Sequence, residues 1–501
     1  MSRNIPSVLL LLVFGLAIRC VALNQPLVDG GLLRQTQTAA CTQSILSESG
    51  FPLSSTISWL GDLDARFVLE LPVYNYLTIG LWHIIGHLDI AGKLTSILLW
   101  VASFLILQPI WQRILDHDEI FWANLLFIIS PLGVFYSQTF MPEMLVQALA
   151  FGFLLASIQY SENPTIWRWL AVTATGLMGL LVKLPEVSHL YFVLAILIYR
   201  LDGWRGMFRP RYLIAAAITA ASLKIWGNYA DSINAIYLPE WTSKHVLPGF
   251  LGTLASRFTV KPWAMIILYT GAFIAAGPAV LAMVYGLREF VRRHRGDVLA
   301  LWLLSIVIFY LVWFGNCGTA QSYYNLPTLA PLCALFGIGT GALLKWEHLA
   351  CWRKAAAASV GIVLVLCATP VLLYLFKQDH QILAATFWIR DHTEVDDLII
   401  VRPSHRWDMI DYYYNPVPAY YSHRRTFVLT RYTPEQVRQS ALDRSRYAVV
   451  TLPRPASQGL LGAINRFRGV AEMKTDSLSW LTSAGFAPFQ EGDGFSVYKK
   501  P

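Results

Sequence analysis

The stretch "PSVLLLLVFGLAIRCVALNQPLVDGGLLRQTQT", residues 6–38, indicates a membrane helix followed at once by an unusual polar loop. Its first part, residues 6–23, is an apolar run about as long as a membrane-crossing helix. Arg19 lies inside this run and no clean cleavage site follows, which favours a retained anchor over a signal peptide. Asp29, Arg34 and Gln35 then stand close together in the loop, so they lie near a membrane surface.

Apolar runs of similar length recur along most of the chain. The 501 residues are 55% hydrophobic and only 14% charged, and the mean hydropathy is +0.47. A soluble domain of this size would need more surface charge, so the composition predicts an α-helical polytopic membrane protein with about eleven helices. The predicted helices span residues 6–23, 93–110, 120–136, 142–160, 167–183, 187–200, 212–228, 263–287, 298–314, 326–344 and 355–376.

The net charge of +8 is concentrated in short loops between these helices, which argues against nucleic acid as a partner. The most basic loops span residues 200–211, 288–296 and 345–354, whereas the loops at the opposite ends hold few Lys and Arg. Basic loops face the cytoplasm in most membrane proteins. We therefore expect a multi-pass inner (plasma) membrane protein with a cytoplasmic N-terminus and an extracytoplasmic C-terminal part.

Two predicted outer segments are long. The first outer loop, residues 24–92, contains "ELPVYNYLTIGLWHIIGHL", which predicts interfacial helices. From residue 377 the charge rises, and strand-like runs such as "DLIIV", "TFVLT" and "YAVVTL" alternate with helical stretches. The sequence thus predicts a transmembrane domain over residues 1–376 and a small extracytoplasmic α/β domain over residues 377–501.

Several polar side chains fall at the predicted outer ends of the helices, at the same depth as Asp29. They are Glu70, Glu143, Lys183, Glu186, Tyr323 and Tyr324. A carboxylate can act as a general base toward a hydroxyl or amine, and a lysine with tyrosines can stabilise a departing phosphate. The combination favours group transfer from a lipid phosphate at the outer face.

Each of these side chains also has a structural explanation. Glu143 and Glu186 both follow a proline at a helix start, where a carboxylate suits the helix dipole, and this explanation fits Glu186 best. Lys183 can be a snorkelling lysine, and the two tyrosines can be interface aromatics. The outer histidines lack metal-ligand spacing and fit interfacial polar groups; they are His83, His87, His189 and His245.

The order of motifs over roughly residues 1–350 resembles the bacterial membrane glycosyltransferases of the GT-C type. The matching motifs are "VDGGLLRQTQTA", "E-LP-YNYL", "FMPEML", "VKLPE" and "YYNLP". This superfamily includes the protein O-mannosyltransferases and the aminoarabinose transferase that modifies lipid A. The resemblance implies a GT-C fold, an inverting reaction and a polyprenyl-phosphate sugar donor.

By this resemblance Asp29 is the catalytic base, and Arg34 and Gln35 shape its site. Glu70 and Glu143 would line the sugar and acceptor pocket. Lys183 and one tyrosine of the Tyr323–Tyr324 pair would hold the donor phosphate. The chain departs from related sequences at residues 30–33, where His and Trp are common, and at Gln321, where a His is common. Gln cannot carry charge, so Gln321 can offer a phosphate only neutral hydrogen bonds.

The leading hypothesis is a glycosyltransferase that moves a hexose or pentose to a lipid, glycan or protein acceptor outside the cytoplasm. A transporter or flippase of lipid-linked sugars is one alternative, although it would need polar groups near the bilayer midplane. A polysaccharide ligase or polymerase with a pyrophosphate-linked donor is another. No cofactor is expected, and a divalent cation held by Asp29, Glu70 and Glu143 stays open.

Overall fold

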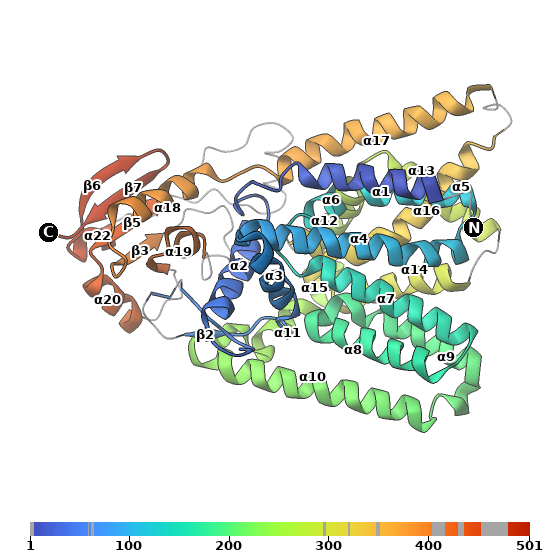
Figure 1. Cartoon of the computed structure of the whole chain (residues 1–501), viewed down its shortest axis with the longest axis horizontal. Helices are drawn as coiled ribbons and strands as arrows, with labels where there is room; N and C mark the ends of the chain where they lie inside the picture. The colour runs from blue at the N-terminus through green and yellow to red at the C-terminus, as the bar shows by residue number, and fades with distance from the viewer. Residues whose placement is uncertain are drawn as a thin grey trace. The chain divides into compact units, whose positions relative to one another are not determined.

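The computed structural model describes residues 5–58, 60–61, 65–293, 297–318, 321–346, 351–402, 416–428, 435–451 and 479–501. The chain forms two compact units (Figure 1). The helical unit comprises Met1–Asn24, Leu69–Tyr74 and Lys93–Phe376. The sheet unit comprises Gln25–Val68, Asn75–Gly92 and Lys377–Pro501.

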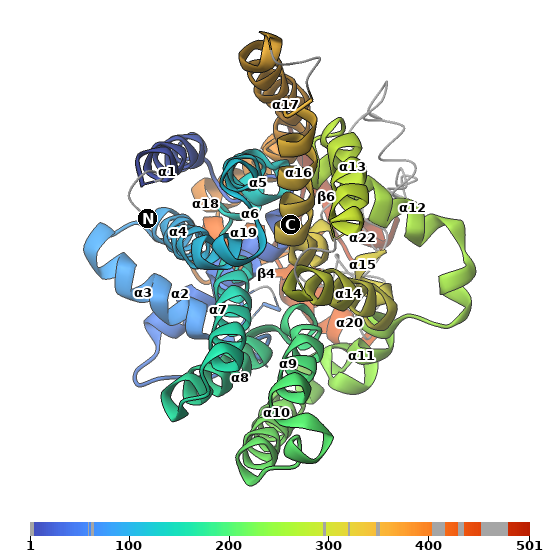
Figure 2. The same cartoon turned by 90° about the vertical axis from the view of Figure 1, so that its right-hand side faces the viewer.

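Long apolar helices build the helical unit. Figure 2 shows them nearly end-on, with α7 packed beside α8 and with α16 packed against both α5 and α13. The α-helices are α1 (Ile5–Cys20), α4 (Leu88–Ile114), α5 (His117–Ile129), α6 (Pro131–Tyr136), α7 (Glu143–Glu162), α8 (Ile166–Ser188), α9 (Leu190–Gly206), α10 (Pro210–Tyr237), α11 (Ser243–Leu251), α12 (Val260–Leu268), α13 (Ala279–Arg292), α14 (Asp297–Val312), α15 (Phe314–Cys317), α16 (Leu329–Leu343) and α17 (Arg353–Leu375). The shorter turns are η1 (Pro239–Trp241), η2 (Ala255–Phe258), η3 (Tyr269–Ile274) and η4 (Ser322–Thr328).

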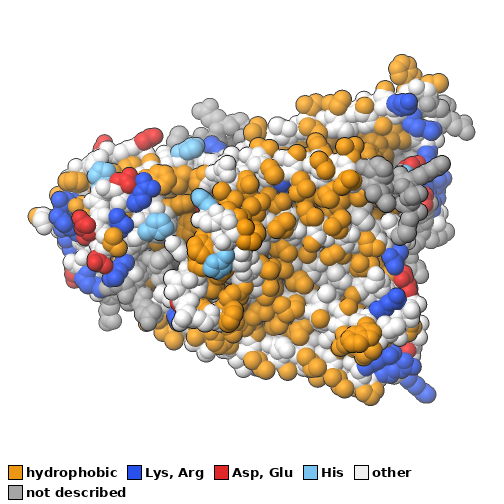
Figure 3. All heavy atoms as spheres, viewed as in Figure 1, with side chains coloured by type: hydrophobic (Ala, Val, Ile, Leu, Met, Phe, Trp, Pro, Cys, Tyr) orange, Lys and Arg blue, Asp and Glu red, His pale blue; other side chains and the backbone are white. Residues whose placement is uncertain are grey.

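Each of the eleven predicted segments contains a helix, but fewer helices have the length and composition of a membrane span. Among the described residues five qualify, namely α4, α7, α8, Ser322–Leu343 and Arg353–His392, and one bent pair makes a sixth. Apolar side chains cover the face of the helical unit in Figure 3, and Lys and Arg gather at one end of it. The chain is thus a multi-pass membrane protein, while the count of eleven stays a prediction.

The predicted helix 263–287 is not one uninterrupted helix. α12 runs into the π-turn η3, and α13 follows after a bend of 102°. Ala276 and Gly277 have φ values of 49° and 80°, which right-handed helices do not use, and Pro278 lacks the N–H that a helix needs. Likewise, the predicted helix 120–136 breaks at Ser130, before Pro131.

Small residues let three helices of the bundle approach closely. A Cβ on Gly339 of α16 would overlap the Ala282 carbonyl of α13, and a Cβ on Gly286 would overlap the Leu335 carbonyl of α16. Gly337 lies in the same way against the backbone of α5 at Glu119. Because lipid gives no hydrophobic drive for helices to associate, such close backbone packing stabilises the bundle.

A mixed sheet of five strands forms the core of the sheet unit, in the order β4–β3–β5–β7–β6. β3 runs parallel to both β4 and β5, while β7 runs antiparallel to β5 and β6. These strands are β3 (Leu398–Arg402), β4 (Arg425–Val428), β5 (Tyr447–Thr451), β6 (Ala487–Gly492) and β7 (Phe495–Lys499), accompanied by α18 (His380–His392), α19 (Val417–Ser422), α20 (Glu435–Arg444) and α22 (Ser479–Ser483). The three strand-like runs predicted from the sequence therefore form neighbouring strands.

The alternating side chains of β3 bury both faces of this sheet. Leu398 and Ile400 pack with Ala441 of α20 on one face. Ile399 and Val401 pack with Trp388 of α18 on the other. Successive residues of a strand point to opposite faces, so "LIIV" suits a strand that is covered on both sides.

Most of the predicted first outer loop, residues 24–92, belongs to the same unit as this sheet, apart from Asn24 and Leu69–Tyr74. It contains α2 (Leu32–Ser47), β1 (Ser55–Thr56), β2 (Arg66–Phe67) and most of α3 (Val73–Ile85). Leu60 pairs with Phe427 of β4, and the Gly61 N–H donates to the Thr426 carbonyl at 2.9 Å. Gly61 has a φ of 69°, and a Cβ there would lie 2.8 Å from Leu398 Cδ1, so only glycine fits this approach.

Candidate functional site

Asp29 lies in the sheet unit, just before α2, and is 4% exposed. Its Oδ1 accepts hydrogen bonds from the Gly31 N–H at 3.0 Å and from Gln35 Nε2 at 2.6 Å. The first bond forms a local turn of the kind that Asp side chains favour, and the second comes from the first turn of the helix. Together the two bonds fix the orientation of the carboxylate.

Asp29, Arg34 and Gln35 lie close together around this turn. Gln35, fully buried, joins Asp29 to α2, since its own N–H also bonds to the Gly31 carbonyl at 3.0 Å. Arg34 is half-buried and donates to Gln37 Oε1 at 2.8 Å. The structure thus places Asp29 and Gln35 in direct contact, and Arg34 beside Gln35 on the same helix.

A second polar cluster lies in the helical unit around the Lys183 ammonium group. Lys183 Nζ donates to both oxygens of Glu143, at 2.7 and 2.6 Å. It also lies 2.6 Å from Glu186 Oε1. All three side chains are buried, so the ammonium and the carboxylates stabilise one another in an environment poor in water.

Two tyrosine rings cover the same ammonium. Lys183 Nζ lies 4.3 Å from the ring centre of Tyr323 and 5.0 Å from that of Tyr324. These distances allow a cation–π attraction with both rings. The Tyr323 hydroxyl donates to Gln321 Oε1 at 2.6 Å, so the glutamine found where related sequences often have His serves as a neutral acceptor.

A break in α8 brings Lys183 into this position. Pro185 has no N–H to bond to the Leu181 carbonyl, and Lys183 has the non-helical φ and ψ of −158° and 93°. The Leu181 carbonyl instead accepts the Leu71 N–H at 3.4 Å. This bond attaches the segment that carries Glu70, and the Glu70 carboxylate acts electrostatically on Glu186.

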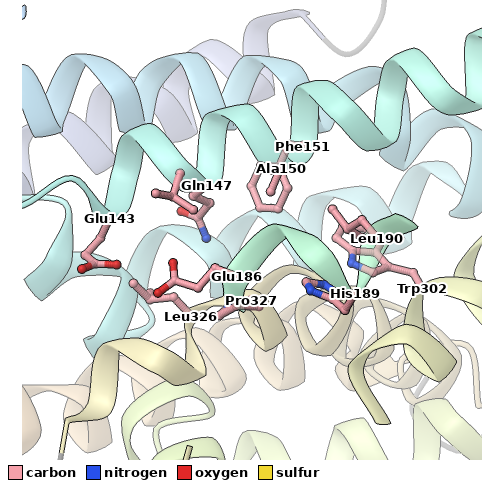
Figure 4. Close-up of a pocket in the computed structure, with 11 residues that line it drawn as sticks. Glu143, Gln147, Ala150, Phe151, Glu186, His189, Leu190, Trp302, Leu326 and Pro327 are labelled. Atoms are coloured by element: carbon pink, nitrogen blue, oxygen red, sulfur yellow. The ribbon is translucent and has the colours of Figure 1, made fainter. Parts of the chain in front are cut away.

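A small buried cavity adjoins the cluster (Figure 4). It has a volume of about 20 Å³, enough for roughly one water molecule. Gln147, Glu186 and His189 line it, and both Gln147 and His189 have a buried polar atom without a hydrogen-bond partner. Apolar side chains make up most of the remaining lining, among them Phe151, Trp302 and Leu326.

Sequence reasoning assigned no role in the site to Glu186, Gln147 and His189. The spacing held a signal for each: Glu186 lies three residues after Lys183, Gln147 four residues after Glu143, and His189 three residues after Glu186. Such spacings place side chains on one helix face. The apolar character of the surrounding runs concealed that signal.

The predicted site residues are thus divided between the two units. Asp29, Arg34 and Gln35 stand in the sheet unit. Those gathered in the helical unit are Glu70, Glu143, Lys183, Tyr323 and Tyr324. In the part of the chain that the structure describes, no three His, Cys, Asp or Glu side chains are grouped as ligands for a metal ion.

No known family model matches the sequence, and no curated protein matches it. Solved structures match the whole fold. ArnT from Cupriavidus metallidurans bound to undecaprenyl phosphate superposes with a TM-score of 0.66 at 11% identity, over 99% of this chain and 98% of that chain. The apo state of the same protein gives a TM-score of 0.66 at 12% identity over the same shares. This chain therefore has the GT-C fold of ArnT.

Proposed function

We propose that this protein is an inverting glycosyltransferase that takes a sugar from a polyprenyl-phosphate donor and transfers it to an acceptor at the outer face of the membrane. The fold carries this proposal, because it matches over almost its full length a protein solved with undecaprenyl phosphate. The buried, oriented carboxylate of Asp29 supplies the chemistry that such a transfer needs.

In this proposal Asp29 is the general base. The acceptor's oxygen or nitrogen attacks the anomeric carbon of the donor sugar and gives its proton to the Asp29 carboxylate. The bond between the anomeric carbon and the phosphate oxygen breaks, and the polyprenyl phosphate leaves with the electron pair. One displacement inverts the anomeric centre. Arg34 and Gln35 shape the site, and the Gln35 amide keeps the carboxylate in its orientation.

The cluster in the helical unit is proposed to hold the donor. Lys183, with Tyr323 or Tyr324, would bind the phosphate, and Glu70 and Glu143 would line the sugar and acceptor pocket. Two carboxylates around one ammonium leave this cluster without net positive charge. A donor phosphate therefore benefits from Lys183 only when a carboxylate takes up a proton or moves away.

We also propose an orientation of the protein in the membrane. The basic end of the helical unit would face the cytoplasm, as would the N-terminus, and the sheet unit would lie outside it. The basic segment 200–211, where α9 meets α10, fits this orientation, since Arg209 and Arg211 pair there with Asp202. The transfer is proposed to need no cofactor, because Asp29 and Lys183 provide the base and the cation.

The test is transfer by the purified protein in detergent. Wild type should release polyprenyl phosphate and glycosylate an acceptor, whereas Asp29→Asn should lose transfer about 10²- to 10⁴-fold, the usual contribution of a general base. Asp391→Asn, the same change at an exposed aspartate of α18, is the matched control. Full activity of correctly folded Asp29→Asn would refute the assignment of the base.

A panel of donors and acceptors separates the alternatives. The donors are polyprenyl monophosphates and pyrophosphates that carry hexoses or pentoses, and the acceptors are lipid A, other glycolipids, glycans and proteins. We expect transfer from a monophosphate donor. Transfer from pyrophosphate donors alone would instead indicate a ligase or polymerase. Movement of the donor from one leaflet of a vesicle membrane to the other, without release of the sugar, would indicate a flippase.

A further inference from the structure

The loop that carries Asp29 is hydrogen-bonded to the C-terminal part of the chain. The Leu27 N–H donates to the Tyr421 hydroxyl oxygen at 2.7 Å. The Tyr421 hydroxyl donates in turn to Asp89 Oδ2 at 2.7 Å. Asp89 belongs to the first turn of α4, so these two bonds join three segments that are far apart in the sequence.

A second connection lies one residue closer to Asp29. The Asp379 N–H, at the start of α18, donates to the Val28 carbonyl at 2.7 Å. The Val28 side chain is fully buried among Ile382, Leu383 and Val417. Both residues before Asp29 are therefore held through their backbones by residues of the C-terminal segment.

Tyr421 is suited to this connection at any ordinary pH. Burial raises the pKa of Tyr421 well above its usual value, and the charges of Asp89 and Asp29 raise it further. The hydroxyl thus keeps its proton and its bond to Asp89. The influence of Asp29 on Tyr421 also shows that the two groups lie close enough to interact electrostatically.

The neighbouring tyrosine offers an internal comparison. The Tyr420 hydroxyl donates to the other oxygen of Asp89, Oδ1, at 2.5 Å. Both tyrosines thus satisfy the same buried carboxylate. Tyr421 differs in one respect, since its hydroxyl also accepts the Leu27 N–H.

We propose that Tyr421 and Asp89 are positioning residues, through which the C-terminal α/β domain holds the Asp29 loop in its reactive geometry. This inference rests on the proposed function of Asp29. It gives the C-terminal domain a role within the reaction, independent of any part in selecting the acceptor. A general base must lie within hydrogen-bond reach of the proton it removes, so a small shift of the loop lowers turnover.

Tyr421→Phe in the full-length protein tests this inference, with Tyr420→Phe as the matched control. Each variant removes one hydroxyl from Asp89, and Tyr421→Phe also removes the acceptor of the Leu27 N–H, so both should lose thermal stability and Tyr421→Phe somewhat more. Tyr421→Phe should also lower kcat about tenfold, with the donor KM changed less than about twofold. Tyr420→Phe should keep kcat within about twofold of wild type.

Hydrogen–deuterium exchange supplies a second readout that does not depend on activity. The amides of residues 27–31 should exchange faster in Tyr421→Phe than in Tyr420→Phe. Asp89→Asn weakens the hydrogen bond between Tyr421 and Asp89 but keeps the acceptor of the Leu27 N–H. It should raise the exchange at residues 27–31 to a smaller extent, and it serves as a second variant where Tyr421→Phe folds poorly.

The outcomes separate the existence of the Leu27–Tyr421 connection from its role in positioning Asp29. Unchanged exchange at residues 27–31 in Tyr421→Phe would overturn the connection itself. Faster exchange with unchanged kcat would overturn its role in positioning Asp29, as would equal losses of kcat in both tyrosine variants. A wild-type protein without transfer activity would refute the proposed function and with it the role in catalysis, whereas the exchange rates would still decide whether the connection exists.

Discussion

Replacing Lys183 with Met should both destabilise the helical unit and abolish donor binding. The Lys183 ammonium pairs with both carboxylates of the cluster, because it donates to Glu143 at 2.7 and 2.6 Å and lies 2.6 Å from Glu186. Met has a similar length but no charge. The substitution therefore leaves two buried carboxylates facing each other without a cation.

The magnitude follows from the burial of the pair. Removing one partner of a buried ion pair costs about 3–5 kcal/mol, since the remaining charge stays out of water. Here the Glu143 side chain is 0% exposed and Lys183 is 8% exposed, so solvent screens the pair little. The two tyrosine rings add a cation–π contribution of about 0.5–2 kcal/mol, which Met also loses.

The double variant Lys183→Met with Glu143→Gln separates stability from binding. Gln has the shape of Glu143 without its charge, so the double variant should recover at least about half of the lost stability. It should not recover binding of undecaprenyl phosphate if the ammonium contacts the phosphate. Thermal unfolding in one detergent gives the stability, and titration with undecaprenyl phosphate gives the binding.

Two results would refute this reasoning. A loss of stability below about 1 kcal/mol in Lys183→Met would mean that the pair contributes no more than a surface ion pair. A double variant that regains both stability and binding would mean that Lys183 serves the fold alone. The single variant Glu143→Gln completes the cycle and should bind the lipid phosphate at least as well as wild type, because the ammonium loses a competing carboxylate.

Three further predictions test other parts of the chain. Gly339→Ala should cost about 1–3 kcal/mol in thermal unfolding because its Cβ meets the Ala282 carbonyl, while Gly361→Ala, with nothing within 4 Å, should be neutral or mildly stabilising. Burial opposes the charge of Glu48, but hydrogen bonds from Arg66, Thr56 and Ser44 outweigh it and hold the pKa of Glu48 below its usual value. The stabilisation that the Glu48 carboxylate provides is therefore present above its ordinary pKa and lost as the pH falls through the lowered pKa. The protection of the amides of residues 44–58 against hydrogen exchange, relative to their intrinsic rates, should therefore decrease below about pH 4, and Glu48→Gln should remove this pH dependence. Transfer activity should persist in excess EDTA, and a loss restored by one divalent cation would contradict a metal-independent reaction.

The helices could be predicted from the sequence because membrane helices depend on local composition. Their interruptions were harder to predict. The break at Lys183 depends on Pro185, which was visible, but also on the Leu71 N–H that bonds to the freed carbonyl. The bend before α13 needs a positive φ at Ala276, and an alanine in the sequence does not predict that conformation.

The sequence singled out the residues of the candidate site but did not indicate the contacts among them. Asp29 and Gln35 lie six residues apart at a helix start, so a local pattern sufficed to link them. Lys183 and Glu143 lie 40 residues apart on different helices, and only their tertiary packing shows that they form an ion pair. Glu186 forms a second ion pair with Lys183. From the sequence alone, its position after a proline was already explained by the helix dipole, so this ion pair was not predicted.

The longest such connection explains why the C-terminal domain had no assignable role from sequence. Leu27 and Tyr421 are 394 residues apart, and their contact uses a backbone N–H, which leaves no trace in the type of residue at position 27. Tyr420 and Tyr421 look alike in sequence, and only the second reaches the loop. In the proposed mechanism the base Asp29 must lie within hydrogen-bond reach of the attacking group, so its placement would depend on a segment whose own residues carry no recognisable catalytic motif.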